Sequence, residues 1–234
     1  MLKKVAEDIA AESGVKTAYY VCDVTVSSMV AETAEKIVRD FGRIDIAVNC
    51  AGGGNCGWTT ELPDEKWLAT MNVNINGLFY CCREFGKVMV RNGYGRMINI
   101  SSMLGSVGMD VEFGMGIPEY AASKGAVNNL TRQLAVEWAG NGVTVNAIAP
   151  GFLVSNQNRK LLFNEDGTPT PRTAKILAGT PMNRFVDNFL KTKCPRKREG
   201  HPGELDSVVV FLAADESRYV TGQIVGDDGG WTAM

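Results

Sequence analysis

The sequence predicts an α/β protein whose parallel sheet is covered by helices on both faces. Two patterns in its 234 residues lead to this fold class. Segments of strand-like composition alternate with segments of helical periodicity, and strands separated by helices run parallel. An apolar content of 45% with 21% charged residues is typical of a globular chain, so disorder and coiled coils are disfavoured. We expect one domain over residues 1–234, with ligands bound at the carboxyl ends of the strands.

The first part of the chain begins this alternation. Residues 1–12 predict a helix, and 17–22 (TAYYVC) is rich in the β-branched and aromatic residues that favour strands. A second helix is expected at 27–41, and Gly42 ends it because glycine adopts the left-handed conformation that closes helices. Residues 44–49 (IDIAVN) then predict a buried strand.

The later elements are a long helix with a kink near its middle, a strand, a helix, a strand, a helix and a final strand. They are expected at 64–91, 97–101, 120–139, 143–149, 204–214 and 223–225. Within the second of these helices, small or apolar residues recur every four positions, which is the spacing of one helix face. These residues are Ala122, Ala126, Leu130, Leu134 and Trp138.

One stretch interrupts the alternation. Between Gly151 and Glu204 lie about fifty residues with four prolines, which is too long for an ordinary connection. An active-site lid over 152–194 is the functional interpretation, and a disordered insertion is the alternative.

The composition excludes several classes of function. Twenty-four basic and 26 acidic side chains leave a net charge of −2, without the positive surplus that nucleic acid binding needs. No apolar run is long enough to cross a membrane, and acidic residues near Met1 stand where a signal peptide needs apolar ones, so we expect a cytoplasmic location. Six cysteines without paired spacing favour reduced thiols, and a single histidine, His201, leaves little material for a metal site.

Tyr120 and Lys124 stand four residues apart on a predicted helix, so their side chains project from one face. A free phenol has a pKa of about 10 and is a poor base at neutral pH. An ammonium group about 5 Å away, at an effective dielectric constant of about 20, would favour the phenolate by roughly 3 kcal/mol, or about two pKa units. The pair could therefore move a hydroxyl proton, although an ordinary exposed pair explains the spacing equally well.

Two further side chains could take part. Ser102 follows a predicted strand and could donate a hydrogen bond to a substrate oxygen, or it could simply close a turn. Asn74 lies mid-helix among other amides and next to a glycine, which oppose a regular helix. A helix kink that holds a water molecule is the functional interpretation, and a tolerated surface patch is the alternative.

Together with the remaining motifs, these residues resemble the short-chain dehydrogenase/reductase family. The matching segments cover about residues 17–232 in the family's order. They are N-C-A-G at 49–52, V-N-x-x-G around Asn74, I-S-S-x-x-G around Ser102, Y-A-A-S-K at 120–124, N-A-I-A-P-G at 146–151, P-x-x-R-x-G-x-P-x-E-L at 195–205 and V-T-G-Q through D-G-G at 220–230.

The resemblance implies a Rossmann-like, doubly wound, three-layer fold and hydride transfer between a secondary alcohol or ketone and NAD or NADP. Tyr120 would be the general acid/base, Lys124 would lower its pKa and hold the nicotinamide ribose, Ser102 would orient the substrate oxygen, and Asn74 would hold a water. Besides Tyr120 and Lys124, the residues implied at the cofactor are Asp23, Val24, Asn49, Ala51, Gly52, Pro150, Gly151, Leu153 and Ser155. A homodimer or homotetramer is implied through the helices at 64–91 and 120–139.

The front of the chain departs from the family pattern. Members open with a strand, a G-x-x-x-G-x-G loop and a helix, whereas residues 1–12 resemble the helix after the second strand. We hypothesise an N-terminally shortened form, in which 17–22 would lack neighbouring strands and leave an exposed edge. The glycines of 52–57 match G-x-G-x-x-G, but no helix can begin directly after them, so a flexible turn explains them better than a phosphate loop.

These expectations leave two functions open. The first is an oxidoreductase acting on sugar alcohols, small ketones, hydroxysteroids or 3-oxoacyl thioesters, among which the sequence does not choose. The second is a non-catalytic or cofactor-impaired remnant of the family that associates with intact subunits.

Overall fold

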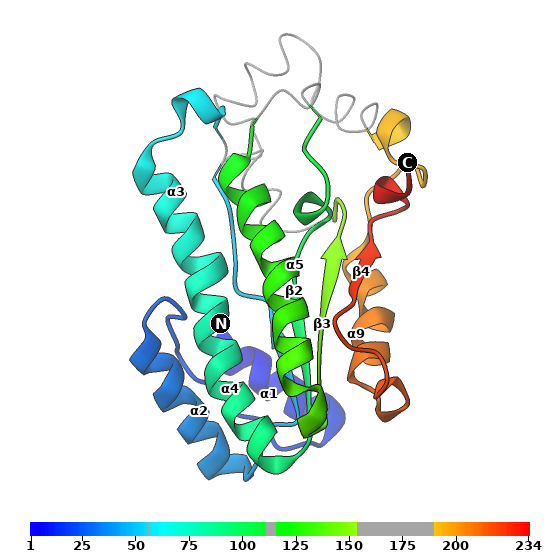
Figure 1. The fold of residues 1–234 in the computed structure, drawn as a ribbon. Coiled ribbons are helices and arrows are strands. Elements are labelled where there is room, and N and C mark those ends of the chain that lie inside the picture. The colour runs from blue at the N-terminus through cyan, green and yellow to red at the C-terminus, as the bar shows by residue number, and fades with distance from the viewer. Residues whose placement is uncertain (56, 111–115, 154–189) are drawn as a thin grey trace.

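A computed structural model of the protein describes residues 1–55, 57–110, 116–153 and 190–234. Within these ranges the chain forms a four-stranded sheet in the order β1-β2-β3-β4, with every neighbouring pair parallel (Figure 1). The strands are β1 (Ile46–Asn49), β2 (Gly95–Ile100), β3 (Val143–Pro150) and β4 (Ile224–Asp227). The predicted parallel α/β fold is confirmed.

Helices cover both faces of this sheet, as a doubly wound fold requires. The helices are α1 (Leu2–Ser13), α2 (Ser27–Phe41), α3 (Asp64–Met71), α4 (Leu78–Asn92), α5 (Pro118–Trp138) and α9 (Asp206–Ala213). On one face, α2, α4 and α5 pack around side chains such as Met97 and Val145. On the other, Leu212 of α9 packs against Ile98 and Ile148. Because alternate strand residues point to opposite faces, both sides of β2 and β3 are dry.

The kink in the long helix is confirmed and has a specific form. α3 and α4 are joined by one wide π-helical turn, Asn72–Gly77. Three amide side chains and a glycine lower the helix propensity of this segment, and π-turns are frequent at functional sites. The predicted end of α2 is also confirmed, since Gly42 has a φ of 86°.

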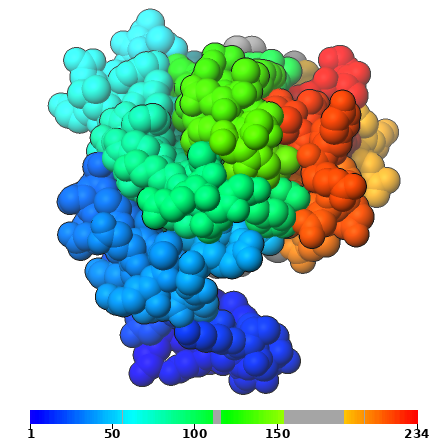
Figure 2. All heavy atoms as spheres, turned by 60° about the horizontal axis from the view of Figure 1, so that its bottom comes forward, coloured from blue at the N-terminus to red at the C-terminus, as the bar shows by residue number. Residues whose placement is uncertain are grey.

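Residues 17–22 do not form the expected strand. No strand of the described residues lies beside them, and strand composition cannot replace a partner for the backbone groups. Side chains tether this segment instead: the Tyr20 hydroxyl donates to Asp40 Oδ2 at 2.7 Å, and Thr17 Oγ1 donates to the Ala6 carbonyl at 2.9 Å. In Figure 2 the first residues, in dark blue, stand apart from the body of the molecule.

β1 therefore lies at an open edge of the described sheet. Ile46 is 49% exposed and Val48 is 43% exposed, although both belong to a strand of apolar composition. α1 has no buried residue, and its apolar side chains Leu2, Val5 and Ile9 are about half exposed. The open edge of the described sheet is thus at β1 and not at residues 17–22, where we expected it.

The buried face of α5 differs from the expected apolar stripe. Leu134 is buried, whereas Ala122 and Ala126 are exposed. The face against the sheet carries polar side chains, among them Ser123, Asn128 and Thr131. Four-residue spacing predicted the helix correctly. Leu134 is buried and Leu130 and Trp138 pack against the core, whereas the first turns of the helix bury polar side chains instead of Ala122 and Ala126.

The residues that the structure describes contain no membrane-spanning helix, no disulfide and no metal-binding cluster. No described helix is long and apolar enough to span a membrane. The five cysteines that the structure describes, Cys22, Cys50, Cys81, Cys82 and Cys194, are all free thiols. Across the same residues, no group of three or more histidine, cysteine or acidic side chains could hold a metal ion.

Candidate active site

The four residues expected to carry the chemistry come together at the carboxyl ends of β1 and β2. Ser102 follows β2, and Tyr120 and Lys124 lie in the first turns of α5. Asn74 lies in the π-turn before α4 and reaches the same place through the loop that follows β1. Parallel strands end at one edge of a sheet, so residues from three distant segments meet there.

Lys124 is buried and firmly held. Its side chain donates a hydrogen bond from Nζ to the Ile100 carbonyl at 2.7 Å, and Nζ lies 5.5 Å from the centre of the Tyr120 ring. Burial disfavours the charged form and lowers the pKa of Lys124 to about 8. A lysine with this pKa can be charged at neutral pH and still give up a proton readily.

The expected lowering of the Tyr120 pKa is not what this structure gives. Burial raises the pKa of Tyr120 above its ordinary value, and a side-chain hydrogen bond with Ser102 opposes that rise. The Lys124 amine lies 5.5 Å from the centre of the Tyr120 ring, and burial destabilises the charge of that amine. The phenol is therefore protonated at neutral pH, which is the acid form of an acid/base pair.

Ser102 closes a turn, which is one of the two roles that the sequence left open, and it also lies beside Tyr120. Its Oγ accepts a hydrogen bond from the Leu104 backbone N–H at 3.2 Å, which caps the short helix Met103–Gly105. The same side chain bonds with the hydroxyl of Tyr120. A strand-end serine that closes a turn can thus also stand beside the phenol, because the cap uses Oγ only as an acceptor.

The Asn74 side chain makes three hydrogen bonds to other residues of the protein. Its Oδ1 accepts from the Gly53 N–H at 2.9 Å, and its Nδ2 donates to the Gly53 carbonyl and to Ser123 Oγ, each at 2.8 Å. Ser123 in turn donates to the Tyr120 carbonyl at 2.8 Å. The amide is 2% exposed, so the interpretation as a surface patch is wrong. It ties the π-turn, the loop after β1 and α5 into one unit.

The glycine-rich loop after β1 does not offer its amides to a phosphate. The N–H groups of Gly53, Asn55 and Gly57 donate to Asn74, Glu119 and Gly116. The next helical turn, Thr59–Glu61, is a single 3₁₀ turn, and α3 begins only at Asp64. A phosphate loop needs free N–H groups at a helix start, so the rejection of this segment is supported.

The expected reason for these glycines was wrong in part. Gly52, Gly54 and Gly57 do not have positive φ angles, so a turn conformation does not require them. A Cβ on Gly54 would lie 2.8 Å from Cδ2 of Tyr120, and one on Gly52 would lie 3.1 Å from Asn74 Oδ1. Glycine is needed because the backbone packs directly on the candidate catalytic side chains.

The residues implied at the cofactor lie in three places: near the loop after β1 and the turn at Asp23, at the end of β1 itself, and at the ends of β3 and β4. Ala51 and Gly52 are exposed beside the Tyr120–Lys124 pair, and Val24 packs on Gly77 of the π-turn. Asp23 caps its own turn, with Oδ1 accepting from the N–H and the hydroxyl of Thr25, and this lowers the Asp23 pKa.

Asn49 is not directed to the expected cleft. Its Nδ2 donates to Asn99 Oδ1 at 2.9 Å and lies 3.1 Å from Met97 Sδ, inside the layer between the sheet and α4. Asn99 then donates to Thr131 Oγ1 of α5 at 3.0 Å. The asparagine of the N-C-A-G segment thus links the sheet to its helices, because the amide meets polar partners on that side.

The last implied residues surround the ends of β3 and β4. Pro150 pairs with Asp227 at the strand ends, and a Cβ on Gly151 would lie 2.7 Å from Cα of Asp228. Leu153 forms a single parallel bridge with Gly200. Ser155 and most of the expected lid lie outside the described residues.

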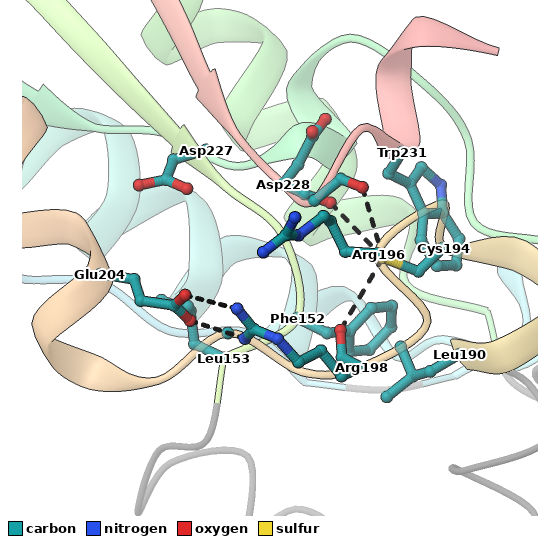
Figure 3. Close-up of a pocket in the computed structure, with 12 residues that line it drawn as sticks. Phe152, Leu153, Leu190, Cys194, Arg196, Arg198, Glu204, Asp227, Asp228 and Trp231 are labelled. Atoms are coloured by element: carbon teal, nitrogen blue, oxygen red, sulfur yellow. Dashed lines mark hydrogen bonds and ion pairs between the residues drawn. The ribbon is translucent and has the colours of Figure 1, made fainter.

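A small pocket of about 90 Å³ lies at this end of β4. Figure 3 shows the residues that line it. Cys194 Sγ lies 3.7–3.9 Å from the carbonyls of Arg198, Asp228 and Gly229, and Arg198 makes a two-pronged ion pair with Glu204 at 2.6 and 2.8 Å. These contacts hold residues 194–204 against the D-G-G turn. The pocket does not include Tyr120 or Ser102 in its lining and is too small for a dinucleotide.

The nicotinamide end of a dinucleotide fits the described residues. An ammonium group has three N–H donors, and one from Lys124 goes to Ile100, so others can meet a ribose hydroxyl. The Tyr120 hydroxyl bonds with Ser102 beside it. The N–H groups of Gly53, Asn55 and Gly57 are not available to a phosphate, because each already donates to a protein oxygen.

Sequence reasoning missed two structural partners of the site. Ser123, the serine of Y-A-A-S-K, joins Asn74 to the backbone at Tyr120. Glu119, immediately before Tyr120, is fully buried and accepts from the Asn55 N–H at 2.9 Å. An acidic residue in the first turn of a helix is ordinarily a solvent-facing cap partner, so the sequence held no sign of this contact.

Comparison with known proteins gives consistent results along the chain. A family model described as enoyl-(acyl carrier protein) reductase matches residues 1–232. The chain is 36% identical over 211 residues to the 3-oxoacyl-(acyl-carrier-protein) reductase of Thermotoga maritima, covering 90% of this chain and 75% of that protein. It is 36% identical over 212 residues to the 2-dehydro-3-deoxy-D-gluconate 5-dehydrogenase of Dickeya dadantii, covering 90% and 74%.

A solved structure extends the similarity to the fold. The gluconate 5-dehydrogenase from Burkholderia cenocepacia, in complex with NADP and tartrate, is 28% identical with a TM-score of 0.84. The match covers 99% of this chain and 81% of that one.

Proposed function

The chain belongs to the short-chain dehydrogenase/reductase family, and from that premise we propose that it interconverts a secondary alcohol and a ketone with Tyr120 as general acid/base. It is an NAD(P)-dependent oxidoreductase of the Rossmann-like class. The observation that carries the proposal is the buried cluster in which Tyr120 bonds with Ser102 and lies next to Lys124.

The proposed chemistry divides hydride and proton between two agents. A nicotinamide held beside Tyr120 and Lys124 would supply the hydride chemistry at the substrate carbon. Tyr120 gives a proton to the substrate oxygen in reduction and removes it in oxidation. Ser102 Oγ, fixed by the Leu104 N–H, donates a hydrogen bond to the same oxygen and places it beside the phenol.

In this proposal Lys124 assists the proton transfer from its position next to Tyr120. The Ile100 carbonyl holds its Nζ at 2.7 Å, and the remaining N–H groups face a ribose hydroxyl in the proposed complex. Asn74 keeps the loop that carries Gly53 against Tyr120 and Lys124. The proposed water of the proton path would lie at the backbone of the π-turn, because the Asn74 side chain is fully engaged with Gly53 and Ser123.

A turnover screen tests the proposal. The 234-residue chain is assayed with NAD and with NADP on four probes, namely D-gluconate, a small ketone, a 3β-hydroxysteroid and a 3-oxoacyl thioester. Tyr120→Phe should lower kcat by about 10²- to 10⁴-fold, which is the usual contribution of an acid/base group. Tyr219→Phe, which changes a tyrosine that is 99% exposed, should leave kcat unchanged. Parental turnover by Tyr120→Phe would refute the proposal.

We also propose a homodimer or homotetramer that uses α4 and α5. Phe79 and Val136 are apolar residues of these helices, and they are 42% and 80% exposed. Apolar side chains exposed on neighbouring helices favour burial against a second copy. Light scattering after size-exclusion chromatography tests this, and a monomeric mass would contradict it.

A second candidate function is a cofactor-impaired member of the family that associates with intact subunits. The occupied N–H groups of Gly53, Asn55 and Gly57 favour it, as does the open edge of the described sheet at β1. NADP titration by calorimetry separates the two candidates. No binding of NADP favours this second function over the first, and tight binding excludes it.

A further inference from the structure

Glu119 is a buried acidic residue that the proposed chemistry does not use. It lies in the first turn of α5, directly before Tyr120, and none of its surface is exposed. Its Oε1 accepts the Asn55 N–H at 2.9 Å, whereas its Oε2 is buried without a hydrogen-bond partner among the described residues. Burying a carboxyl group with one oxygen unpaired costs free energy, so a specific contact must hold it there.

The contact that Glu119 makes leads directly to the Tyr120 ring. Asn55 follows Gly54, whose Cα packs so closely on Tyr120 that an added Cβ would lie 2.8 Å from Cδ2 and 3.1 Å from Cβ of the ring side chain. On the other side of Gly54, the Asn74 side chain bonds to both the N–H and the carbonyl of Gly53. The backbone at Gly54 is therefore clamped at each neighbour, by Asn74 before it and by Glu119 after it.

Asn55 extends this clamp to a second helix. Its Nδ2 donates to Thr70 Oγ1 of α3 at 3.2 Å and to the Lys66 carbonyl at 3.4 Å. Thr70 is itself buried. Glu119 thus joins the start of α5 to α3 through one loop residue, next to the glycine that packs on the Tyr120 ring.

From this geometry we propose that Glu119 is a positioning residue, which holds the Gly54 backbone against Tyr120 through the Asn55 N–H and so keeps water away from the phenol. The inference rests on the proposed role of Tyr120. Loss of the clamp lets the loop move off the ring and hydrates the hydroxyl. Since burial is the main cause of the raised Tyr120 pKa, hydration brings that pKa back toward its ordinary value.

Two readouts that need no substrate test the clamp. The first is the phenolate absorbance of Tyr120, taken as the difference between each variant and the same variant with Tyr120→Phe, followed against pH. The second is amide hydrogen exchange at Gly54 and Asn55. In Glu119→Ala, the Tyr120 pKa should fall and exchange of the two amides should speed up about tenfold or more.

The conservative variant separates positioning from charge. Glu119→Gln keeps an Oε1 acceptor for Asn55, so both readouts should stay parental, whereas Glu119→Asp is one methylene shorter and should behave as Glu119→Ala does. Glu119→Asp also serves where the alanine variant fails to fold, as judged by thermal unfolding. Glu137→Ala, at the exposed end of the same helix, is the matched control and should leave both readouts unchanged.

Three outcomes overturn or isolate the inference. An unchanged Tyr120 titration in both Glu119→Ala and Glu119→Asp would overturn it. So would a glutamine variant that behaves as alanine does, because charge and not the Asn55 contact would then matter. Where Tyr120→Phe retains parental turnover, the proposed function fails instead, and the clamp readouts still report on Glu119 by themselves.

Discussion

Replacing Asn74 by aspartate tests the network that holds the candidate site together. The change keeps the Oδ1 acceptor for the Gly53 N–H but removes both N–H donors, which bond to the Gly53 carbonyl and Ser123 Oγ at 2.8 Å. It also places a carboxylate oxygen, in the position of Nδ2, next to the Gly53 carbonyl oxygen and Ser123 Oγ. Ser123 cannot simply turn its hydrogen round, because it donates to the Tyr120 carbonyl.

The expected loss follows from these two bonds. A buried polar group left without its partner costs about 1–3 kcal/mol, so two such groups give roughly 2–4 kcal/mol after partial relaxation. For a chain of 234 residues, 1 kcal/mol corresponds to about 2–4 °C in Tm, which predicts a fall of roughly 4–16 °C. The new carboxyl is buried beside oxygen atoms and should have a raised pKa, so the folded state binds its proton more tightly than the unfolded state.

Urea and thermal unfolding at two pH values measure the effect. The deficit of Asn74→Asp should be smaller near pH 5 than near pH 8, because a group with a raised pKa in the folded state loses stability as pH rises. Asn76→Asp is the matched control, since Asn76 is exposed in the same π-turn and its side chain donates to Asn72 Oδ1, and it should change stability by less than about 0.5 kcal/mol. A loss below about 1 kcal/mol for Asn74→Asp at pH 8 would refute the reasoning.

Three further predictions follow from single contacts. The pKa of Lys124 is lowered from 10.5 to about 8, so between these pH values the unfolded state binds more protons than the folded state. The stability of the parent should therefore rise by up to about 3 kcal/mol relative to Lys124→Met from pH 8 to 10.5. A difference in urea unfolding that does not change with pH would contradict this. Gly54→Ala should cost about 1–3 kcal/mol by overpacking Tyr120, while Gly108→Ala, whose Cβ meets nothing within 4 Å, should not; equal Tm values would disprove the close contact. Backbone amides of β1 should exchange hydrogen faster than those of β3, which has strands on both sides, and equal protection would exclude an open edge.

Local cues predicted the fold well where local physics decides it. The bounds of α2 at Ser27–Phe41 and its closure at Gly42 were predicted from periodicity and one glycine. The break before α4 was predicted from amides and a glycine that weaken a regular helix. In each case the determining interaction lies within one turn of the residue that signals it, so a single sequence contains the information.

Residues 17–22 show where such cues fail. Their β-branched and aromatic side chains favour an extended backbone, but a strand exists only where a neighbour accepts and donates its hydrogen bonds. The described sheet ends at β1, and Tyr20 reaches Asp40 instead of a sheet. Composition therefore predicted a conformation and could not predict its partner.

The sequence predicted which four residues of the candidate site come together, but not the direction in which the Tyr120 pKa shifts. Motif spacing brought Tyr120, Lys124, Ser102 and Asn74 to one place, because each motif stands at a strand end or on the helix that follows. The sign of the Tyr120 pKa shift was wrong for a physical reason. The simple Coulomb estimate counted a full ammonium charge and ignored the loss of water, which acts on phenolate and ammonium alike.

Burial of both groups changes what the pair can do. Desolvation raises the Tyr120 pKa and lowers the Lys124 pKa to about 8, so each group moves away from its charged form. A neutral phenol can give its proton to a substrate oxygen, and an ammonium group with a lowered pKa is a readier proton donor than an exposed lysine. The loop at Gly54, held by Asn74 and Glu119, maintains this dry state, so we expect the proton chemistry to depend on residues that never touch a substrate.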